Sequence, residues 1–411
     1  MSNWKQVSDF VSFTTKGITP KYVKNSSIIV LNQKCIRNNR IDYSFSQYTD
    51  DTKQIADSKF VQRGDILVNS TGTGTAGRCA FVKELPENHL LITDSHILIL
   101  RCHSYYEAQC LSYLLFSFEK TLMSFMTGSS GQSELDKVVL LNIKIKLPND
   151  SNKQKKIARV LSDLDTKIEL NSKINAELEA MTKTLYNYWF VQFDFPDANG
   201  KPYKTSGGKM VWNAELKREI PEGWESGYLN DLYNFQYGSG NTNPDDGGEY
   251  PIYGSNGVIG GYGEYNNEDA PVIGHIGNNC GSLVYAYGKH YVTYNGVMCK
   301  IKKPFDKFFG YCTLLSKDLK TKRRGSSQPF ISYDLLNDID IVIPDARIMK
   351  MFCDLIVPSY ENVISKIKEN QELASLRDWL LAMLMNGQIT VTDVEEKLDM
   401  VAENNVEYKK N

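Results

Sequence analysis

The chain has 411 residues, of which 41% are hydrophobic and 23% charged, so it is long enough for two or three folded domains. No stretch approaches the roughly 20 apolar residues of a membrane span, and the first residues lack the features of a signal peptide. We therefore expect a soluble, cytoplasmic protein. Its eight cysteines contain no CxxC pair and its five histidines form no cluster with ligand spacing, which predicts reduced core thiols and no metal site.

The net charge of −2 gives no sign of a uniformly basic nucleic-acid binder. The last 21 residues hold six acids and three lysines, so this −3 segment leaves residues 1–390 at +1, and we treat 389–411 as an acidic tail. Any phosphate-binding surface must therefore be local. The densest basic run is "KDLKTKRRGSSQ", which begins at Lys317 and could equally be a solvated charged face.

A glycine-rich stretch, "GDILVNSTGTGTAGRC" at 64–79, contains Gly72-x-Gly74-x-x-Gly77, the spacing of a dinucleotide-binding loop. That loop requires a helix after it, because the helix N-terminus helps to hold the pyrophosphate. Here "RCAFV" follows, which is typical of a second strand. We therefore favour a polar loop between two strands over a cofactor site.

Internal repetition is the most informative feature of the sequence. Residues 128–148, "GSSGQSELDKVVLLNIKIKLP", and 325–344, "GSSQPFISYDLLNDIDIVIP", share a Gly-Ser-Ser turn, an alternating strand and a final proline. "DAPVIGHIGNNCGSLVYAY" at 269–287 corresponds in the same way to the glycine-rich stretch. The chain therefore contains one architecture twice, with two different loop chemistries.

A long helical pattern follows each copy, over 151–190 and over 346–388. Apolar residues recur at spacings of three and four, which is typical of coiled-coil seams. Asn171 and Asn370 interrupt the two patterns; they could fix the register inside the seam or lie at its edge. Because helices of this length are too long for the interior of one compact domain, we expect them to pack together, antiparallel.

The remaining segments complete the predicted organisation. Residues 1–150 and 221–345 carry many short β-rich runs separated by Gly, Asn and Pro turns, and 191–220 has the composition of an exposed linker. The predicted fold class is α+β: two β-rich domains separated by a pair of long antiparallel coiled-coil helices, as a pseudo-twofold internal repeat.

In this order, the motifs "KGITP", "GDILVNSTGTGTAGR", "REIPEGWE", "LNDIDIVIP" and "LRDWLLAMLMNGQI" resemble the DNA-specificity (S) subunit of type I restriction-modification systems. The resemblance covers nearly the whole chain. It implies that 1–150 and 221–345 are target recognition domains, each of which recognises one half of a bipartite target in double-stranded DNA. One departure is His275 in "VIGHIGNNCG", where related loops often carry arginine.

The resemblance also implies the partners and the place of the cofactors. Two methyltransferase (M) subunits, which bind S-adenosylmethionine, would dock on the helices, and motor-nuclease (R) subunits, which use ATP and Mg, would join them. This chain itself would bind no cofactor and no metal, would not be an enzyme, and would contact no membrane. The sequence agrees in lacking a GxxxxGK[ST] loop for ATP and a complete Asn/Asp-Pro-Pro-aromatic motif.

Candidate DNA contacts are polar side chains on the predicted loops, because phosphates are bound by cations and hydroxyls, while Arg or Lys suits guanine and Asn or Gln suits adenine. Each of them could also be an ordinary turn or surface residue. They are Lys16, Thr19, Lys21, Thr71, Thr73, Thr75, Arg78, Ser129, Ser130 and Gln132 in the first domain, and Ser239, Asn241, Asn243, His275, Asn278, Asn279, Arg323, Arg324, Ser326, Ser327 and Gln328 in the second.

Four aromatic residues, Tyr186, Trp189, Phe190 and Trp379, lie beside the helical seams. Because such residues commonly anchor interfaces, we expect them to contact the opposite recognition domain or the methyltransferase partner.

Two other functions remain as alternatives. Pro196-Asp197 followed by Glu215-Leu216-Lys217 fits the pattern of a PD-(D/E)xK metal-dependent nuclease, although both halves lie in the predicted linker. The helices alone would also suit a coiled-coil scaffold that binds only proteins.

Overall fold

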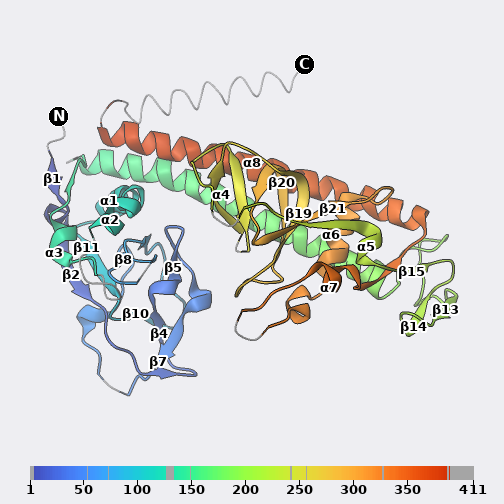
Figure 1. Ribbon diagram of the computed structural model, residues 1–411. Coiled ribbons are helices and arrows are strands. Elements are labelled where there is room, and N and C mark those ends of the chain that lie inside the picture. The colour runs from blue at the N-terminus through green and yellow to red at the C-terminus, as the bar shows by residue number, and fades with distance from the viewer. Residues whose placement is uncertain are drawn as a thin grey trace. The chain divides into compact units, whose positions relative to one another are not determined.

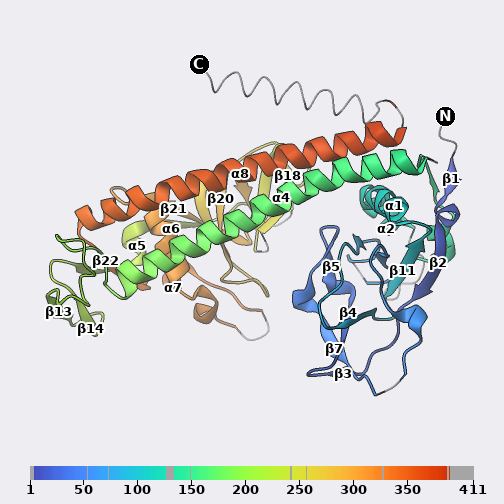
Figure 2. The same cartoon turned by 180° about the vertical axis from the view of Figure 1, so that it is seen from behind.

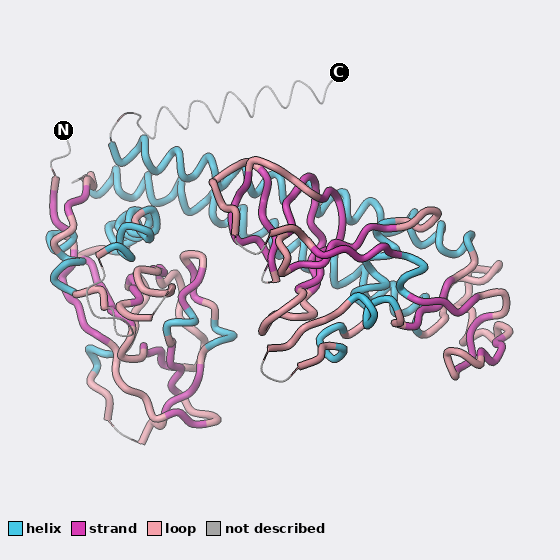
Figure 3. Tube along the Cα trace, in the orientation of Figure 1, coloured by secondary structure: helices cyan, strands magenta, loops and turns pink. Residues whose placement is uncertain are grey.

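The computed structural model describes residues 4–52, 54–72, 74–125, 134–148, 150–240, 243–255, 257–325, 328–386 and 388. The chain folds into two compact units. Unit 1 comprises Met1–Ile168 and Gln371–Asn411, and unit 2 comprises Glu169–Asn370. Both combine strands and helices (Figure 3), so the expected mixture of α and β structure is confirmed. No helix among the described residues is long and apolar enough to cross a membrane.

The main sheet of unit 1 has four antiparallel strands in the order β2-β11-β8-β9. Successive side chains on a strand point to opposite faces, and here both faces are buried. Ile66 and Val68 therefore join the core under helix α1, while Leu67 joins a second core on the other face. The bounds are β2 (Val11–Lys16), β11 (Ile97–Cys102), β8 (Ile66–Asn69), β9 (Cys79–Phe81) and α1 (Tyr105–Ser117).

A second sheet of unit 1 has the order β10-β4-β7-β3, and its β10 and β4 run parallel. Two short strand pairs, β1 with β12 and β5 with β6, complete the β structure described in this unit. The bounds are β10 (Leu90–Thr93), β4 (Ile28–Leu31), β7 (Gln47–Thr49), β3 (Tyr22–Val23), β1 (Lys5–Gln6), β12 (Lys144–Ile145), β5 (Ile36–Arg37), β6 (Arg40–Ile41), α2 (Glu119–Ser124), α3 (Lys137–Leu141), η1 (Val7–Asp9), η2 (Gln33–Cys35), η3 (Tyr43–Phe45) and η4 (Asp57–Lys59).

Unit 2 has a six-stranded sheet in the order β16-β21-β19-β20-β17-β18, in which only β17 and β20 pair in parallel. Two further pairs join β13 to β14 and β15 to β22. The bounds are β16 (Tyr233–Tyr237), β21 (Gly296–Ile301), β19 (Asn267–Gly274), β20 (Leu283–Val292), β17 (Tyr250–Gly254), β18 (Gly257–Tyr262), β13 (Met210–Asn213), β14 (Arg218–Pro221), β15 (Glu225–Tyr228), β22 (Asp340–Ile343), α5 (Leu229–Leu232), α6 (Lys307–Ser316), α7 (Tyr333–Asn337), the π-helical turn η5 (Asn187–Val191) and η6 (Leu319–Lys322).

The same strand order occurs in both units. The order β2-β11-β8-β9 of unit 1 matches β16-β21-β19-β20 of unit 2, with antiparallel neighbours throughout. A helix with a side-chain N-cap follows the second strand of each order: Ser104 accepts from the backbone amide of Glu107 before α1, and Asp306 accepts from that of Phe308 before α6. The predicted strand–loop–strand segments are confirmed as β8–β9 and β19–β20.

Two long helices, α4 (Ser151–Tyr186) and α8 (Ala346–Asn386), each contribute to both units and lie side by side in Figures 1 and 2. Within unit 2 they run antiparallel, because Asn175 contacts the carbonyl of Val363 while Tyr186, further along α4, packs on Phe352. Asn171 is fully buried between them, so it lies inside the seam and not at its edge.

In unit 1 the same two helices are tied to each other and to α1 by a polar network. Arg377 of α8 donates to Asp165 of α4 over 2.8 Å, and the hydroxyl of Tyr113 in α1 donates to the other carboxylate oxygen over 2.7 Å. The large apolar side chains around this network come from α1, α4 and α8 and form one core. The start of α4 and the end of α8 are therefore part of the folded body of unit 1.

Much of the segment 191–220 is exposed, but it is folded within unit 2 and is not a free linker, which corrects that part of the expectation. Phe193 and Phe195 are buried, and the Phe195 ring stacks on Tyr203 and on Trp224 with centroid distances of 4.6 and 4.9 Å. Burial of this much aromatic surface outweighs the high Gly, Pro and Lys content on which the expectation rested. All eight cysteines are free and seven are buried, as predicted for reduced core thiols.

Candidate nucleic-acid interface

In unit 2 the loop between β19 and β20 and the basic segment after α6 form one continuous surface. Ile276 and Phe330 form an antiparallel bridge, and the Gly277 amide donates to the Pro329 carbonyl over 2.8 Å. Phe330 in turn pairs with Arg324 through two backbone hydrogen bonds of 2.8 Å. The structure thus brings together two loops that lie about 50 residues apart in the sequence.

Two glycines of the β19–β20 loop have different roles. Both have a positive φ, +88° at Gly277 and +81° at Gly281, a conformation that favours glycine. A Cβ at Gly281 would lie 2.8 Å from the carbonyl oxygen of Leu319, so this glycine lets the loop pack on η6. A Cβ at Gly277 would meet nothing within 4 Å, so the backbone is open to a ligand there.

His275 is buried, which corrects its assignment as a DNA contact. Its Nδ1 lies 2.8 Å from the carbonyl oxygen of Ile331, and its ring packs against Tyr237 and Tyr294 at centroid distances of 4.3 and 5.3 Å. Ile331 also donates its amide to the His275 carbonyl over 3.0 Å. His275 therefore fastens the β19–β20 loop to the segment after Phe330 and positions the residues around it.

The exposed side chains of this surface have hydrogen-bonding and cationic groups. Arg323 and Arg324 are exposed and form no ion pair with any described residue. Other predicted contacts that are exposed here or on neighbouring strands are Ser239, Asn243, Asn278, Asn279 and Gln328. The side-chain amide of Asn243 also donates to the Ile259 carbonyl over 3.3 Å, and the backbone amide of Ser239 donates to the Val292 carbonyl.

Two aromatic residues of this surface, Tyr294 and Phe330, were not predicted from the sequence. Both are exposed, Tyr294 beside His275 and Phe330 beside Arg324. The only available signal was that both lie between the regular strands and helices, where a large exposed apolar side chain is uncommon. We add them to the candidate interface because aromatic faces stack on bases.

In unit 1 the β8–β9 loop converges with the end of β2 and the segment before α3. Thr71 forms a backbone bridge with Glu134, and its hydroxyl lies 2.6 Å from Nδ1 of His96. The ammonium group of Lys16 lies 2.5 Å from a carboxylate oxygen of Glu134. Thr19 is exposed nearby, after the last residue of β2. The motifs "KGITP" and "STGTGTAG" therefore share one surface, as unit 2's corresponding loops do.

The predicted cations of unit 1 all have carboxylate partners. Besides Lys16, Lys21 pairs with Asp50 at 2.9 Å, and Arg78 lies 3.7 Å from Glu119. The hydroxyl of Thr75 donates within the loop and toward Gln33. Each of these cations could contact DNA only by exchanging its carboxylate partner for a phosphate. Breaking an exposed ion pair costs little free energy.

The glycines of the β8–β9 loop serve mainly the packing of the chain. A Cβ at Gly72 would lie 2.1 Å from Oε1 of Gln33, and one at Gly77 would lie 3.0 Å from Cβ of Leu122. Only Gly74 faces open space, with φ +76°. β9 pairs antiparallel with β8, so the helix of a dinucleotide-binding loop is absent and that interpretation is excluded.

A family model for the type I restriction modification DNA specificity domain matches residues 1–180 and 221–372. The chain belongs to this family. It is 26% identical to the type I restriction enzyme MjaIX specificity subunit of Methanocaldococcus jannaschii over 69% of this chain and 70% of that one. Identity to the type I restriction enzyme HindI specificity subunit of Haemophilus influenzae is 24%, over 95% and 100% of the two chains.

The fold of this DNA specificity family also has solved examples. The crystal structure of the type I restriction-modification S subunit from M. genitalium matches with a TM-score of 0.50 and 17% identity, over 93% of this chain and 96% of that one. The two matched regions, 1–180 and 221–372, each contain one strand order described above and part of one long helix. The similarity to the S subunits inferred from the sequence motifs is thereby confirmed.

Three of the four aromatic residues expected at an interface, Tyr186, Trp189 and Phe190, are buried in the core of unit 2. There Tyr186 and Phe190 contact the opposite recognition segment, 221–345, which is one of the two expected alternatives, and the docking of a methyltransferase on these three side chains is corrected. Phe190 packs on Phe309 and Phe352 at 5.3 and 4.9 Å, and the Tyr186 hydroxyl donates to Thr313 over 3.0 Å. Trp189 packs on Phe352 as well. These rings hold the end of α4 to the recognition segment 221–345 and present no surface to another subunit. Trp379 is 48% exposed, and its assignment remains a prediction.

The acids of the nuclease-like pattern belong to separate local structures in this specificity-family chain. Asp197 accepts from the backbone amides of Asn199 and Lys201, each over 2.8 Å, and so caps a turn. Glu215 accepts from the Ser226 hydroxyl. No group of three or more metal-ligating side chains occurs in the part of the chain that the structure describes. Several predicted contacts lie outside that part: Thr73, Ser129, Ser130, Gln132, Asn241, Ser326 and Ser327.

Proposed function

We propose that this chain is the non-catalytic DNA specificity subunit of a type I restriction-modification complex and that each unit recognises one part of a two-part target in double-stranded DNA. The observation that carries this proposal is the recurrence of one strand order in both units, with the β8–β9 and β19–β20 loops at matching places. The two loops differ in chemistry, "STGTGTAG" in one and "HIGNNCG" in the other. A shared scaffold with different loops suits two related recognition events and supports a pseudo-twofold internal repeat.

The exposed residues of unit 2 have the chemistry for DNA recognition. Arginine forms paired hydrogen bonds with guanine, and asparagine or glutamine does so with adenine. Arg323, Arg324, Asn278 and Gln328 therefore supply both kinds of donor next to the open backbone of Gly277. In unit 1, Thr19, Lys16 and the backbone at Gly74 would approach the DNA, with Lys16 exchanging Glu134 for a phosphate.

The long helices suit the assembly of the complex. At 1.5 Å per residue the 36 residues of α4 extend about 54 Å, longer than the ~34 Å between half-sites one DNA turn apart. We therefore propose that α4 and α8, as a coiled-coil pair, set the spacing of the two half-sites.

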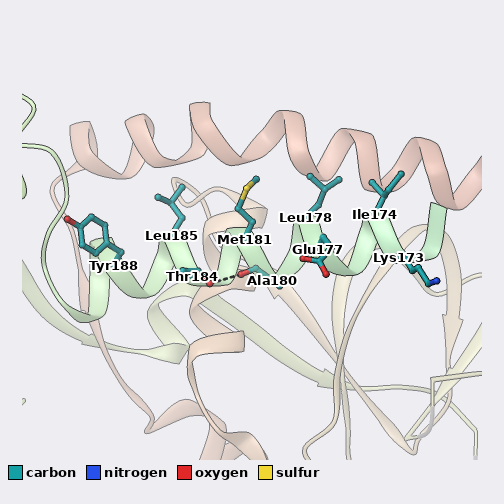
Figure 4. Close-up of a pocket in the computed structure, with 9 residues that line it drawn as sticks. All are labelled: Lys173, Ile174, Glu177, Leu178, Ala180, Met181, Thr184, Leu185 and Tyr188. Atoms are coloured by element: carbon teal, nitrogen blue, oxygen red, sulfur yellow. Dashed lines mark hydrogen bonds between the residues drawn. The ribbon is translucent and has the colours of Figure 1, made fainter. Parts of the chain in front are cut away.

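One face of α4 supports the docking of a methyltransferase subunit. Ile174, Leu178, Met181 and Leu185 follow one another along the helix on the side toward α8 (Figure 4), yet Met181 remains 57% exposed. An open groove of about 840 Å³ accompanies this apolar row. Apolar surface of this kind favours a protein partner. S-adenosylmethionine in the M subunits, and ATP and Mg in the R subunits, would then be the partners' cofactors.

Mapping methylated adenines across the genome of the source cell, with the gene intact and deleted, tests the proposal. We expect deletion to abolish methylation of one two-part motif. Replacing residues 1–150 by those of a relative should change one half of that motif and leave the other half intact. A deletion that leaves every methylated motif in place, or a replacement that alters both halves, would contradict the model of two independent recognition units.

A further inference from the structure

Two tryptophans occupy equivalent places at the start of the two recognition regions. Trp4 directly precedes β1, which pairs with β12, and Trp224 directly precedes β15, which pairs with β22. In both regions this pair joins the first strand to the last strand before a long helix. Yet Trp4 is 63% exposed, whereas Trp224 is 8% exposed. The same structural position is therefore covered in unit 2 and uncovered in unit 1.

The cover of Trp224 is the chain that leaves α4. Phe195 stacks on the Trp224 ring at a centroid distance of 4.9 Å, and Phe193 packs edge-on at 5.6 Å. Both follow the final turn of the helix, in which the Gln192 amide donates to the Asn187 carbonyl over 2.9 Å. The sequence after that turn is Phe-Asp-Phe, with apolar residues at alternate positions.

The end of α8 in unit 1 has the same form. The Gln388 amide donates to the carbonyl of Met383 over 3.0 Å, again five residues back. Leu384 and Met385 are buried in the core of unit 1, as Trp189 and Phe190 are in that of unit 2. The next residues are Ile389-Thr390-Val391, which repeat the apolar–polar–apolar pattern.

The uncovered position in unit 1 is an apolar groove of about 650 Å³. Trp4 forms one wall, and Phe118, Leu122, Phe125, Val139 and Ile143 line the rest. Two cations lie at this groove: Lys144 lines it, and the Lys146 ammonium sits 5.0 Å from the centre of the Trp4 ring. The chain beyond Val391 is acidic, with Asp393, Glu395 and Glu396 next in sequence. The apolar lining of the groove thus suits Ile389 and Val391, and its two lysines carry the charge opposite to that of the acidic residues that follow.

We propose that residues 389–396 dock in this groove of unit 1, with Ile389 and Val391 against Trp4 and the acidic residues beside Lys144 and Lys146. The docked segment would complete unit 1 as 193–195 complete unit 2. It would also fasten the end of α8 to β1, because Leu384 and Met385 already share a core with Val7 and Ile145. This inference concerns the folding of the chain and does not depend on its DNA-binding function.

The emission of Trp4 reports directly on the proposed contact. Subtracting the fluorescence spectrum of the Trp4→Phe variant from that of the intact chain isolates this residue among five tryptophans. We expect the emission of a shielded indole, which iodide quenches poorly. In the Ile389→Asp/Val391→Asp double variant, the Trp4 emission should move to longer wavelength and become accessible to iodide. If Trp4 in the intact chain already emits as an exposed indole, the proposal is wrong.

Two controls separate this proposal from its rivals. Thr390→Asp adds one negative charge, against two in the double variant, at the position where unit 2 has Asp194, so it should leave the Trp4 emission unchanged. The emission of Trp224, isolated through Trp224→Phe, should also be unaffected by the double variant, which shows that unit 2 remains folded. An unchanged Trp4 emission in the double variant would mean that another segment fills the groove. Emission that depends on protein concentration would assign the groove to a second copy of the chain. Either result overturns the proposal.

Discussion

The side-chain amide of Asn171 on α4 donates to Oδ1 of Asn370 on α8 over 2.9 Å. The same amide lies 2.9 Å from Oε2 of Glu369, and Lys366 donates to Oδ1 of Asn171 over 3.2 Å. Asn171 is fully buried, so its amide is satisfied only when these α8 residues lie opposite it. A shift of one helical turn between the helices would leave a buried amide without partners. This polar cluster therefore specifies the register of the pair.

Replacing Asn171 by alanine should lower the free energy of unfolding by about 1–3 kcal/mol, because the three partners on α8 lose their hydrogen bonds to this buried side chain. Urea unfolding followed by circular dichroism measures the change. The exposed Lys183→Ala on the same helix should stay within about 0.5 kcal/mol of the parent. A double-mutant cycle with Asn370→Ala should give a coupling on the order of 1 kcal/mol, and additive effects would show that the two amides act independently.

The sequence indicated the helices and the two loops because these depend on local patterns. Spacings of three and four residues predicted α4 and α8, and alternation around glycines predicted β8–β9 and β19–β20. The pattern could not say whether Asn171 was central or peripheral, since one turn of difference in packing leaves the spacing unchanged.

The roles of individual side chains at the candidate interface were harder to predict from the sequence, because they depend on contacts between residues far apart in the chain. His275 looked like a DNA contact until the structure placed Ile331 against its ring nitrogen. Lys16 looked like a free cation, and its partner Glu134 lies 118 residues away. The sequence left open whether Trp189 contacts the opposite recognition domain or another subunit, and only the structure places it in a core formed with residues of 221–345 and of α8.

Replacing Arg323 or Arg324 by alanine should weaken binding to the DNA target. Loss of an arginine that bonds to a guanine should weaken the binding free energy by about 1–3 kcal/mol and relax the sequence preference at one position. Loss of an arginine that bonds only to phosphate should weaken binding to all sequences and reduce the slope of log K against log salt concentration by about 1. Titration of a labelled duplex carrying the mapped motif, at several salt concentrations, distinguishes the two.

The matched control is Lys209→Ala, since Lys209 is an exposed cation of the same unit that pairs with Glu222 at 2.5 Å. It should leave the affinity unchanged. Equal losses from Lys209→Ala and from the arginine variants would indicate a diffuse electrostatic effect and no local interface.

Two glycine substitutions in the β19–β20 loop should differ in their effect on stability. The Cβ of Gly277→Ala would face open space, so this variant should lose about 1–2 kcal/mol of stability, only because its φ of +88° is left-handed. Gly281→Ala has a similar φ, and its Cβ would also lie 2.8 Å from the Leu319 carbonyl oxygen, so it should cost more. Urea unfolding of both variants checks the order. The reverse order would mean that the loop does not rest on η6 as described.

The stability of the chain should decrease in mild acid because of His290. Burial lowers the pKa of this residue, whose Nε2 lies 3.0 Å from the Asn267 amide. A histidine with a lowered pKa in the folded state contributes stability above its unfolded pKa of about 6.5, and this contribution is lost as the pH falls toward the folded value. The unfolding temperature should therefore fall between pH 7.5 and 5.5, and His290→Gln should reduce that dependence. The exposed His103→Gln should not, and a parallel loss in both variants would assign the effect elsewhere.

Trp379 on α8 is the remaining aromatic candidate for a subunit interface. Because it is 48% exposed, Trp379→Ala should change the free energy of unfolding by less than about 0.5 kcal/mol. Exposed tryptophans at interfaces are often hot spots, so the same change should weaken binding of the methyltransferase subunit by about 2 kcal/mol or more, roughly 30-fold. Trp212 in β13 is similarly exposed, and Trp212→Ala is the matched control that should bind normally. Co-purification of tagged variants with the methyltransferase, followed by titration, measures both. Retained binding by Trp379→Ala would place the docking surface elsewhere on the helices, and the apolar row around Met181 would be the next surface to test.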